Sequence, residues 1–393
     1  MASIRERRPA CWNYQQPTDN DQQTSNNQTI NKPWDWCLDV GGLLGVGCWS
    51  LDVDGGLAGL LLRRAGGYHG TMSKILFVGT SEFAVPALRA LRAAKKEVAA
   101  VVTQPDRSQG RGLNLEPSPV KRCALEAGLP VLQPEDVNAA ESVEAVLATG
   151  ARLAVVAAYG QKLSKRLLSL LPGGWYNLHA SLLPRHRGAS PVVRALLDGD
   201  EWTGVTIFRI VPKMDAGPVV AIARHRIAYP VTGGALTATL SDLSAALLLD
   251  VLPALEEGRA LELPQDETQA TSAGKLSKEA GRIDWREPAA AIARKIYAFQ
   301  PWPGAFTALK RKDGAPVRVM LIEAAVENGE TEKRGDRETG RIVAVGKNGI
   351  DVLTGEGTVR IAKLKPDGKR EMTAGEFANG CRLAPGDAFG NVE

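Results

Sequence analysis

The chain has 393 residues, 44% of them hydrophobic, so it is long enough to bury a sizeable core and to form more than one domain. The net charge of +4 is concentrated in residues 271–393, with 21 basic and 17 acidic side chains, which allows a polyanionic partner without requiring one. The five cysteines and four histidines form no CxxC, HxxH or HExxH pattern and no apolar run reaches about 18 residues, so we expect no disulfide framework, no metal site and no membrane span.

Residues 1–71 differ in composition from the rest of the chain. They hold 4 of the 8 tryptophans and 3 of the 5 cysteines, and 10 of the 19 residues from Asn13 to Asn31 are Asn or Gln. Polar sequence of low complexity cannot bury enough apolar area to offset the entropy of ordering. We therefore expect residues 1–71 to be disordered, or to be an artefactual extension of a gene that starts at Met72.

The sequence that follows has the pattern of alternating strands and helices. A buried strand is predicted at residues 75–79, a helix at 83–94 and a second strand at 98–103. Further strands are expected at Val131 and Leu153. This order predicts an α/β fold with a doubly wound, Rossmann-like parallel sheet. The turn at Gly79 lacks the second and third glycines of a dinucleotide fingerprint, which argues against a nicotinamide cofactor.

The stretch at residues 176–191, YNLHASLLPRHRGASP, is the strongest candidate for chemistry. Asn177 and His179 are two residues apart on a strand predicted at 175–180, so they share one face near its carboxyl end. Ligands of open parallel sheets bind beyond that end, and an amide beside an imidazole suits an oxyanion. By itself, such a pair is more often a core histidine beside a turn-forming asparagine.

A second motif lies in a turn between strands predicted at 203–211 and 219–227, where the sequence KMDAGP contains Asp215. An aspartate in a turn is usually structural. In combination, however, N-x-H, SLLPxxRG and D-x-G resemble the methionyl-tRNA formyltransferase family of folate-dependent formyltransferases. The resemblance extends from Met72 almost to the C-terminus.

The resemblance implies transfer of a formyl group from 10-formyltetrahydrofolate, the co-substrate, to the α-amino group of methionyl initiator tRNA, without a metal. Asn177 and a protonated His179 would stabilise the oxyanion, while Asp215 would orient the imidazole, raise its pKa and assist proton transfer. The folate site would be lined by Ser181, Leu182, Leu183 and Pro184. Arg185 and Arg187 would contact phosphate or the folate tail, or simply hold the loop.

The loop at residues 103–121, TQPDRSQGRGLNLEPSPVK, reads in isolation as an ordinary surface loop. In the family, the corresponding loop enters the acceptor-stem region of the tRNA, which makes Arg107 and Arg111 the candidate tRNA-binding residues. Several relatives follow this arginine with lysines where the chain has Leu113 and Asn114. This departure weakens the expected phosphate contacts without moving them.

The remaining chain is expected to form a long helix at residues 236–255, completing a catalytic domain at 72–262, and then a polar linker at 263–281. Short strands separated by glycine turns from Gly340 onwards predict a second, smaller OB-like β-barrel domain at 282–393. In the family this domain contacts tRNA. Composition alone equally allows a barrel that binds nothing.

Two other functions are compatible with the motifs. One is a formyltransferase acting on a small amino-sugar nucleotide or on glycinamide ribonucleotide. The other is a nucleic-acid-binding module with an inactive catalytic fold, although Asn177, His179 and Asp215 are all present. We expect a monomer of the bacterial cytoplasm that binds initiator methionyl-tRNA and folate, but neither DNA nor membrane.

Overall fold

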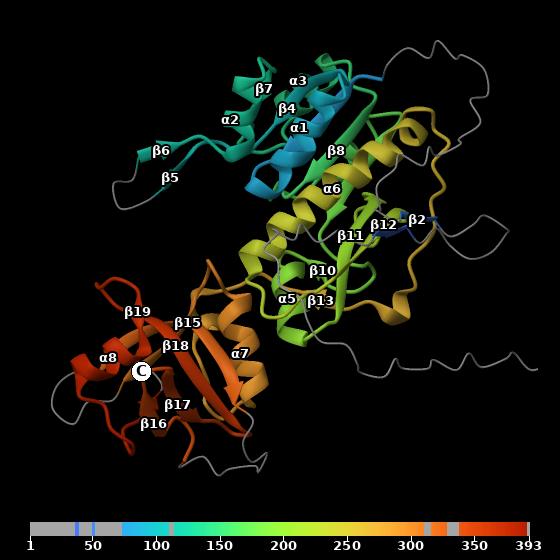
Figure 1. Ribbon diagram of the computed structural model, residues 1–393. Helices are drawn as coiled ribbons and strands as arrows, with labels where there is room; N and C mark the ends of the chain where they lie inside the picture. The colour runs from blue at the N-terminus through green and yellow to red at the C-terminus, as the bar shows by residue number, and fades with distance from the viewer. Residues whose placement is uncertain are drawn as a thin grey trace, which may run out of the picture.

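The protein consists of an α/β body followed by a smaller antiparallel β body (Figure 1). The computed structural model describes residues 36–38, 49–51, 73–109, 114–309, 316–327 and 338–390. This architecture confirms the predicted fold class.

The α/β body is built on one mixed sheet. Five parallel strands lie side by side in the order β7 (Val131–Leu132), β4 (Val98–Val102), β3 (Ile75–Gly79), β8 (Leu153–Ala157) and β9 (Gly174–His179). Every residue of β3 and β8 is buried, because helices cover both faces of the sheet. The strands predicted at 98–103 and 175–180 each end one residue earlier than expected.

Two further strands extend the sheet beyond β9 with reversed direction. β11 (Trp202–Arg209) pairs antiparallel with β9, and β12 (Val219–Arg226) pairs antiparallel with β11. The hairpin between β11 and β12 contains the Asp-x-Gly motif. Because β11 runs antiparallel to β9, its carboxyl end lies beside Tyr176 rather than beside His179, and the turn after it has to fold back to approach His179.

Helices from distant parts of the sequence cover the two faces of this sheet. One face packs against α1 (Val85–Ala93), α2 (Pro119–Glu126) and α6 (Gly233–Glu256), and the other packs against α3 (Ala140–Ala148) and α4 (Lys165–Leu168). The helix predicted at 83–94 is divided into a short 3-10 turn, Glu82–Ala84, and α1, which has proline in its first turn.

Helix α6 is long and apolar enough to cross a membrane by length and composition alone, with a mean hydropathy of 1.6 over its best window. Half of that window is buried, and the helix packs against α1, β11 and β12. Leu236, Leu240 and Leu248 are among the fully buried side chains of the core. The apolar side chains of α6 therefore form part of the core of the α/β body.

Two three-residue strands come from the N-terminal segment. β1 (Trp36–Leu38) and β2 (Trp49–Leu51) pair with each other, and β1 joins the edge of the sheet where Leu38 faces Ala223 of β12. The other residues of 1–72 lie outside the described part of the chain, so disorder or an artefactual origin of residues 1–71 stays a prediction.

The C-terminal body has its own core between a curved antiparallel sheet and two helices, α7 (Ala289–Ala298) and α8 (Ala374–Cys381). The sheet contains β14 (Ala305–Leu309), β15 (Val317–Glu327), β16 (Ile342–Gly346), β17 (Gly349–Leu353), β18 (Thr358–Pro366), β19 (Met372–Thr373) and β20 (Phe389–Gly390). The strands predicted from Gly340 onwards are confirmed, whereas the sequence analysis missed β14 and β15.

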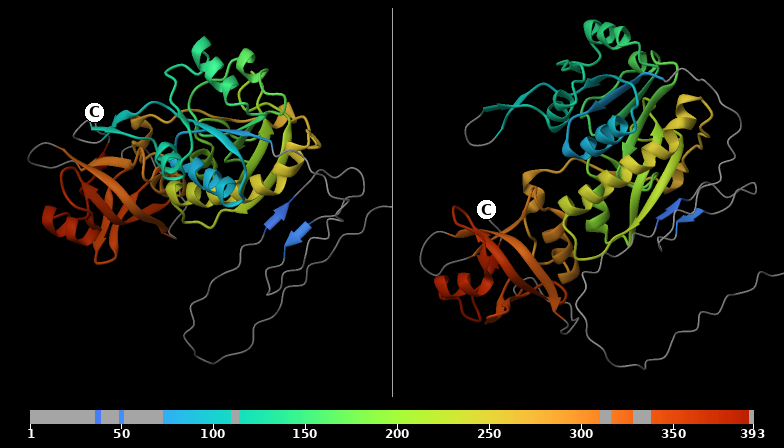
Figure 2. Two further views of the ribbon diagram at one scale, coloured as in Figure 1. Left: turned by 90° about the horizontal axis from the view of Figure 1, so that it is seen from above. Right: turned by 45° about the horizontal axis from the view of Figure 1, so that its top comes forward.

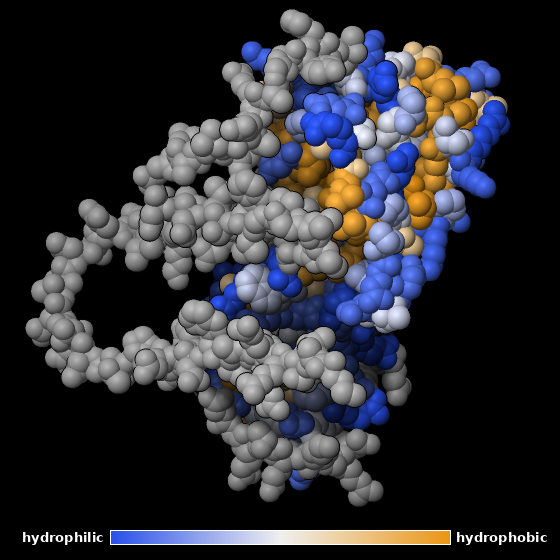
Figure 3. Space-filling model, turned by 90° about the vertical axis from the view of Figure 1, so that its right-hand side faces the viewer, coloured by the Kyte–Doolittle hydropathy of each residue, from blue (hydrophilic) through white to orange (hydrophobic). Residues whose placement is uncertain are grey.

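The C-terminal body and a projecting hairpin extend to the same side of the α/β body (Figure 2). The hairpin consists of β5 (Arg107–Gln109) and β6 (Asn114–Glu116), which pair antiparallel. Figure 3 shows the molecule from the side opposite to this extension. In the lower part of that view the coloured residues are mostly hydrophilic, whereas apolar residues gather over parts of the α/β body.

Candidate active site

Strand β9 places Asn177 and His179 on one face, as the sequence predicts. The strand lies between β8 and β11, with Val156 beside Asn177 and Thr206 beside His179. His179 is only 5% exposed, whereas Asn177 is half-buried. Asn177 is therefore partly open to solvent, whereas the imidazole of His179 is almost completely enclosed.

Asp215 reaches the same place from the turn between β11 and β12. Its Oδ2 lies 3.8 Å from Nδ1 of His179, which is too long for a direct hydrogen bond. The same oxygen accepts a hydrogen bond of 2.7 Å from the main-chain N–H of Gly188. Asp215 has a left-handed backbone (φ 48°), and a side chain at Gly217 would collide with the carbonyl of Arg209. The glycine of Asp-x-Gly is therefore required by a close approach of the backbone.

The hydrogen bonding of His179 determines which ring nitrogen carries the proton. Nε2 lies 3.0 Å from the main-chain oxygen of His186, and a carbonyl oxygen can only accept, so Nε2 is the donor. In the neutral ring, Nδ1 is then an unprotonated acceptor that faces Asp215. Phe208 packs edge-on against the imidazole, with the ring centroids 6.3 Å apart.

The charge of His179 differs from the sequence-based expectation of a protonated imidazole. Burial lowers the pKa of His179 below its ordinary value, although the charge of Asp215 and the bond to the His186 carbonyl act in the opposite direction. Asp215 thus raises the pKa as expected, but the loss of hydration outweighs it. The resting imidazole is neutral at physiological pH.

The stretch between β9 and α5 (Pro191–Asp198) is held by bonds within the protein. The Ser181 hydroxyl donates to the Arg185 carbonyl over 2.7 Å, and Thr206 Oγ1 bridges the main chain of Ser181 and Leu183. The Leu183 side chain is buried, whereas Leu182 and Pro184 are half-buried. Of the four candidate folate residues, Ser181 and Leu183 therefore have side chains directed to internal contacts.

The basic residues of this stretch are also bound internally. Arg185 pairs with Asp200 over 2.6 Å, and Asp200 accepts a second bond of 2.6 Å from His186 Nε2. Arg187 is 9% exposed and donates to Gln265 and Glu267. Among the alternatives left open by the sequence, these contacts favour arginines that hold the loop. The sequence analysis missed Asp200 and Gln265, which lie outside any motif.

Of the two candidate tRNA residues, the structure places one on the projecting hairpin. Arg107 begins β5, is exposed, and donates to Gln104 Oε1 over 3.0 Å. Arg111 follows β5 in the sequence and lies outside the described residues. At the base of the hairpin, Asp106 is held by Lys121 at 2.6 Å and by Gln133 at 2.7 Å.

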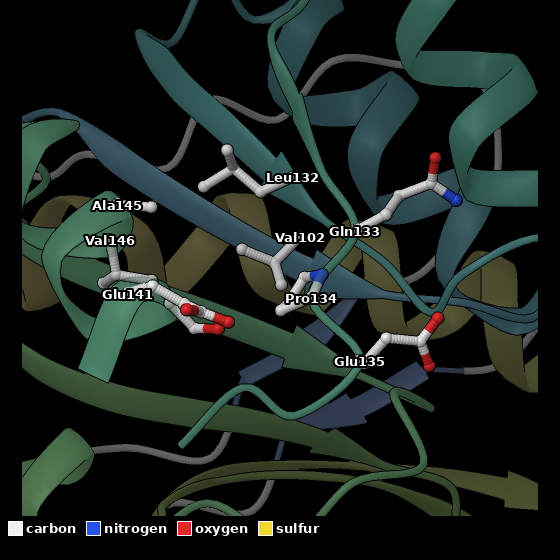
Figure 4. A pocket seen from close by; sticks show the side chains of 9 residues that line it. Val102, Leu132, Gln133, Pro134, Glu135, Glu141, Ala145 and Val146 are labelled. Carbon is white, nitrogen blue, oxygen red and sulfur yellow. The ribbon is translucent and has the colours of Figure 1, made fainter. Parts of the chain in front are cut away.

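A separate hollow of about 320 Å³ lies where β4 and β7 end, beside α3 (Figure 4). Its lining includes Leu132, Glu135 and Glu141. Strands β3 and β8 separate it from β9, so it does not coincide with the cluster of Asn177, His179 and Asp215. In the described part of the chain, no group of three or more His, Cys, Asp or Glu side chains could hold a metal ion.

The donor set of the cluster fits a formyl donor. An accessible amide N–H can hydrogen-bond a carbonyl oxygen as it gains negative charge, and an imidazole and a carboxylate beside it can exchange protons. A Rossmann-like sheet that carries this cluster at its internal strand β9, followed by an antiparallel β domain, defines the class of the formyltransferases.

Comparison with known proteins agrees with this class. The Formyl transferase family matches residues 73–252, and the Formyl transferase C-terminal domain matches residues 275–382. Methionyl-tRNA formyltransferase of Methylobacillus flagellatus is 45% identical over 320 residues, covering 81% of this chain and all of that protein. The enzyme of the same name from Methylococcus capsulatus is 43% identical over 311 residues, covering 79% of this chain and 98% of that protein. The chain belongs to the methionyl-tRNA formyltransferase family.

A solved structure shares the fold at much lower identity. HypX from Aquifex aeolicus in complex with tetrahydrofolic acid is 18% identical with a TM-score of 0.53, covering 80% of this chain and 48% of that one. At this identity the likeness concerns the fold alone.

Proposed function

We propose that the chain transfers the formyl group of 10-formyltetrahydrofolate to the α-amino group of methionine on initiator tRNA, for the initiation of translation. The observation that carries the proposal is the convergence of Asn177, His179 and Asp215 in a chain that matches named methionyl-tRNA formyltransferases over nearly their whole length. Bound 10-formyltetrahydrofolate supplies an activated formyl carbon.

The residues of the cluster match the needs of an amine nucleophile. An α-amino group with a pKa of about 7.7–8.0 is partly neutral at physiological pH, so the enzyme has to position it and remove one proton. The neutral His179 presents a free lone pair on Nδ1, while Nε2–H stays bonded to the His186 carbonyl. Nδ1 therefore takes the proton of the attacking amine, and Asp215 stabilises the resulting imidazolium.

The same groups complete the transfer. Asn177 donates its amide N–H to the oxygen that becomes negative during the attack. Once protonated, His179 returns the proton from Nδ1 to the departing nitrogen, so that the ring is neutral again at the end of the cycle. Gly188, through its N–H, keeps Oδ2 of Asp215 directed at the imidazole throughout.

The proposal assigns separate regions to the partners. Residues 72–262 form the catalytic domain and residues 282–393 the C-terminal domain that contacts tRNA, together with Arg107 and Arg111 of the hairpin. The hairpin and the C-terminal body extend to one side, which supports a shared tRNA surface (Figure 2). Leu182 and Pro184, which are half-buried, contribute to the folate site through the part of each that is exposed. Ser181 and Leu183 contribute through the shape of the turn.

The proposed enzyme works as a monomer in the bacterial cytoplasm, without DNA or membrane. The burial of α6 against the sheet supports the last point, because the longest apolar helix among the described residues is used in the core. Sedimentation at several protein concentrations tests the monomer.

A formylation assay tests the function. The purified chain and 10-formyltetrahydrofolate are offered charged initiator tRNA, UDP-aminoarabinose and glycinamide ribonucleotide side by side. Formylation of the charged tRNA alone supports the proposal. Preferential formylation of either small acceptor would replace it with a small-molecule formyltransferase.

A further inference from the structure

We infer that Gln265 is a positioning residue for Asp215, and that the segment expected to be a linker forms part of the catalytic scaffold. Residues 263–273, here called the strap, leave the α/β body and pass across both sides of the candidate active site before the chain reaches the C-terminal body. The inference rests on the catalytic role proposed for Asp215.

The side-chain amide of Gln265 holds the Asp215 turn from outside. Its Nε2 donates hydrogen bonds to the main-chain oxygens of Asp215 and Gly217, at 2.8 and 2.7 Å. The first carbonyl belongs to Asp215 itself, whose left-handed backbone aims the carboxylate at His179, and the second lies two residues further along the same turn. Both N–H groups of the amide are thus used to fix a backbone conformation that a non-glycine residue adopts at a cost.

Arg187 fixes the orientation of this amide. Its Nη2 and Nε donate to Oε1 of Gln265 at 2.7 and 3.1 Å, and its guanidinium also pairs with both carboxylate oxygens of Glu267 at 3.0 Å. A guanidinium only donates hydrogen bonds and a main-chain carbonyl only accepts them. Only one orientation of the Gln265 amide therefore satisfies its two bonds from Arg187 and its two bonds to the turn carbonyls. Glu267 is also bonded by Lys213, at the start of the same turn.

The strap is attached equally to the other side of the site. Its strand β13 (Ser272–Ala273) pairs parallel with β10 (Arg187–Gly188), and Thr271 Oγ1 accepts from the N–H of His186 over 2.8 Å. The strap thus bonds the peptide unit that carries the His186 carbonyl, which orients His179. It also bonds the peptide unit that carries the N–H of Gly188, which holds Asp215. The strap therefore fixes the spacing between the two proton-transferring groups.

This arrangement gives Gln265 an effect on the reaction that passes through Asp215. Without the amide, the turn loses two hydrogen bonds and the carboxylate is free to rotate away from Nδ1 of His179. Misplacement of a catalytic group by about 1 Å can cost roughly 100-fold in rate. Substrate affinity depends on other residues, so kcat should fall while KM stays close to its wild-type value.

The test is a double-mutant cycle in the full-length chain. Gln265→Met keeps the length of the side chain but removes both donors, and it should lower kcat for formylation by about 10- to 100-fold with KM changed by less than about twofold. The matched control is Gln269→Met, at an exposed position that bonds neither Asp215 nor Arg187 in the described structure, and it should leave kcat unchanged. In an Asp215→Ala background, Gln265→Met should cause no further loss of kcat.

Two results would contradict the inference. If Gln265→Met lowers kcat by the same factor with and without the Asp215 carboxylate, Gln265 does not act through Asp215 and the inference is wrong. Should the methionine variant fail to fold, Gln265→Glu keeps an oxygen for Arg187 while removing the donors, and unchanged kcat in that variant would also overturn the inference. An inactive wild type, or a fully active Asp215→Ala, would instead contradict the proposed function.

Discussion

Nε2 of His179 donates a hydrogen bond to the main-chain oxygen of His186, 3.0 Å away. This bond leaves Nδ1 of the neutral ring free to accept a proton on the side of Asp215. The carbonyl itself is fixed by its own residue, because His186 has a left-handed backbone (φ 59°) and its buried ring is bonded to Asp200. The chemistry of His179 thus depends on residues that do not touch substrate.

Replacing Asn177 with alanine should remove the main hydrogen-bond donor to the developing oxyanion. We expect a loss of about 3 kcal/mol in transition-state stabilisation, roughly 10²-fold in kcat, with the fold intact because the side chain is only half-buried. Steady-state formylation of charged initiator tRNA measures the loss, and thermal unfolding serves as the check on the fold. A variant with normal kcat would exclude Asn177 from the oxyanion site.

The pair between His186 and Asp200 should contribute to stability. Asp200→Ala leaves the buried Nε2 of His186 without a partner, which should cost about 1–3 kcal/mol in the free energy of unfolding. The nearby Asp198 pairs with Arg194 in a more exposed helical contact, and Asp198→Ala should cost only about 0.3–0.5 kcal/mol. Urea unfolding of both variants makes the comparison, and equal losses would mean that the buried pair has no special weight.

The pH dependence of stability should report the neutral state of His179. Burial keeps the pKa of His179 below its ordinary value of 6.5 in the folded protein, so the unfolded chain binds a proton first as the pH falls. Below 6.5 this group therefore destabilises the folded state, increasingly down to its own lowered pKa. His179→Gln should flatten the decrease in urea midpoint between about pH 7.5 and pH 5.5. A variant that loses stability on acidification as steeply as the wild type would show that His179 is not held neutral.

Salt dependence should reveal the role of the hairpin. If Arg107 and Arg111 contact phosphates, each change to alanine should weaken tRNA binding and flatten the slope of log affinity against log salt by about 0.7–0.9. Arg107 uses one N–H for Gln104 Oε1, and its other guanidinium donors are free to contact a phosphate. Affinities are measured at two or more salt concentrations for each variant. If the variants and the wild type have the same slope, these arginines do not contact tRNA phosphates.

The sequence predicts those features that depend on residues close together in the chain. Continuous apolar runs indicate the buried strands β3 and β8, and the spacing of two between Asn177 and His179 predicts their shared face. Gln265 could not be found in this way. It lies in a polar, turn-rich stretch that resembles a linker, and its importance comes from contacts with residues 48 and 78 positions away.

The charge of His179 is unpredictable from sequence for a related reason. The sequence shows that an aspartate is available to raise its pKa, but the opposing effect is the loss of water around the ring. That loss depends on how completely the surrounding elements enclose it, including the edge-on contact with Phe208 of the neighbouring strand β11.

The central claim is that Asp215 acts with His179 in transferring the proton of the attacking amine. The most direct measurement is the single-turnover rate of formyl transfer to charged initiator tRNA by the wild type, Asp215→Ala, His179→Ala and the double variant. Each single change should reduce the rate by at least about 10²-fold, and the double variant should lose far less than the product of the two because the groups act as a unit. Near-normal transfer by Asp215→Ala would contradict the account.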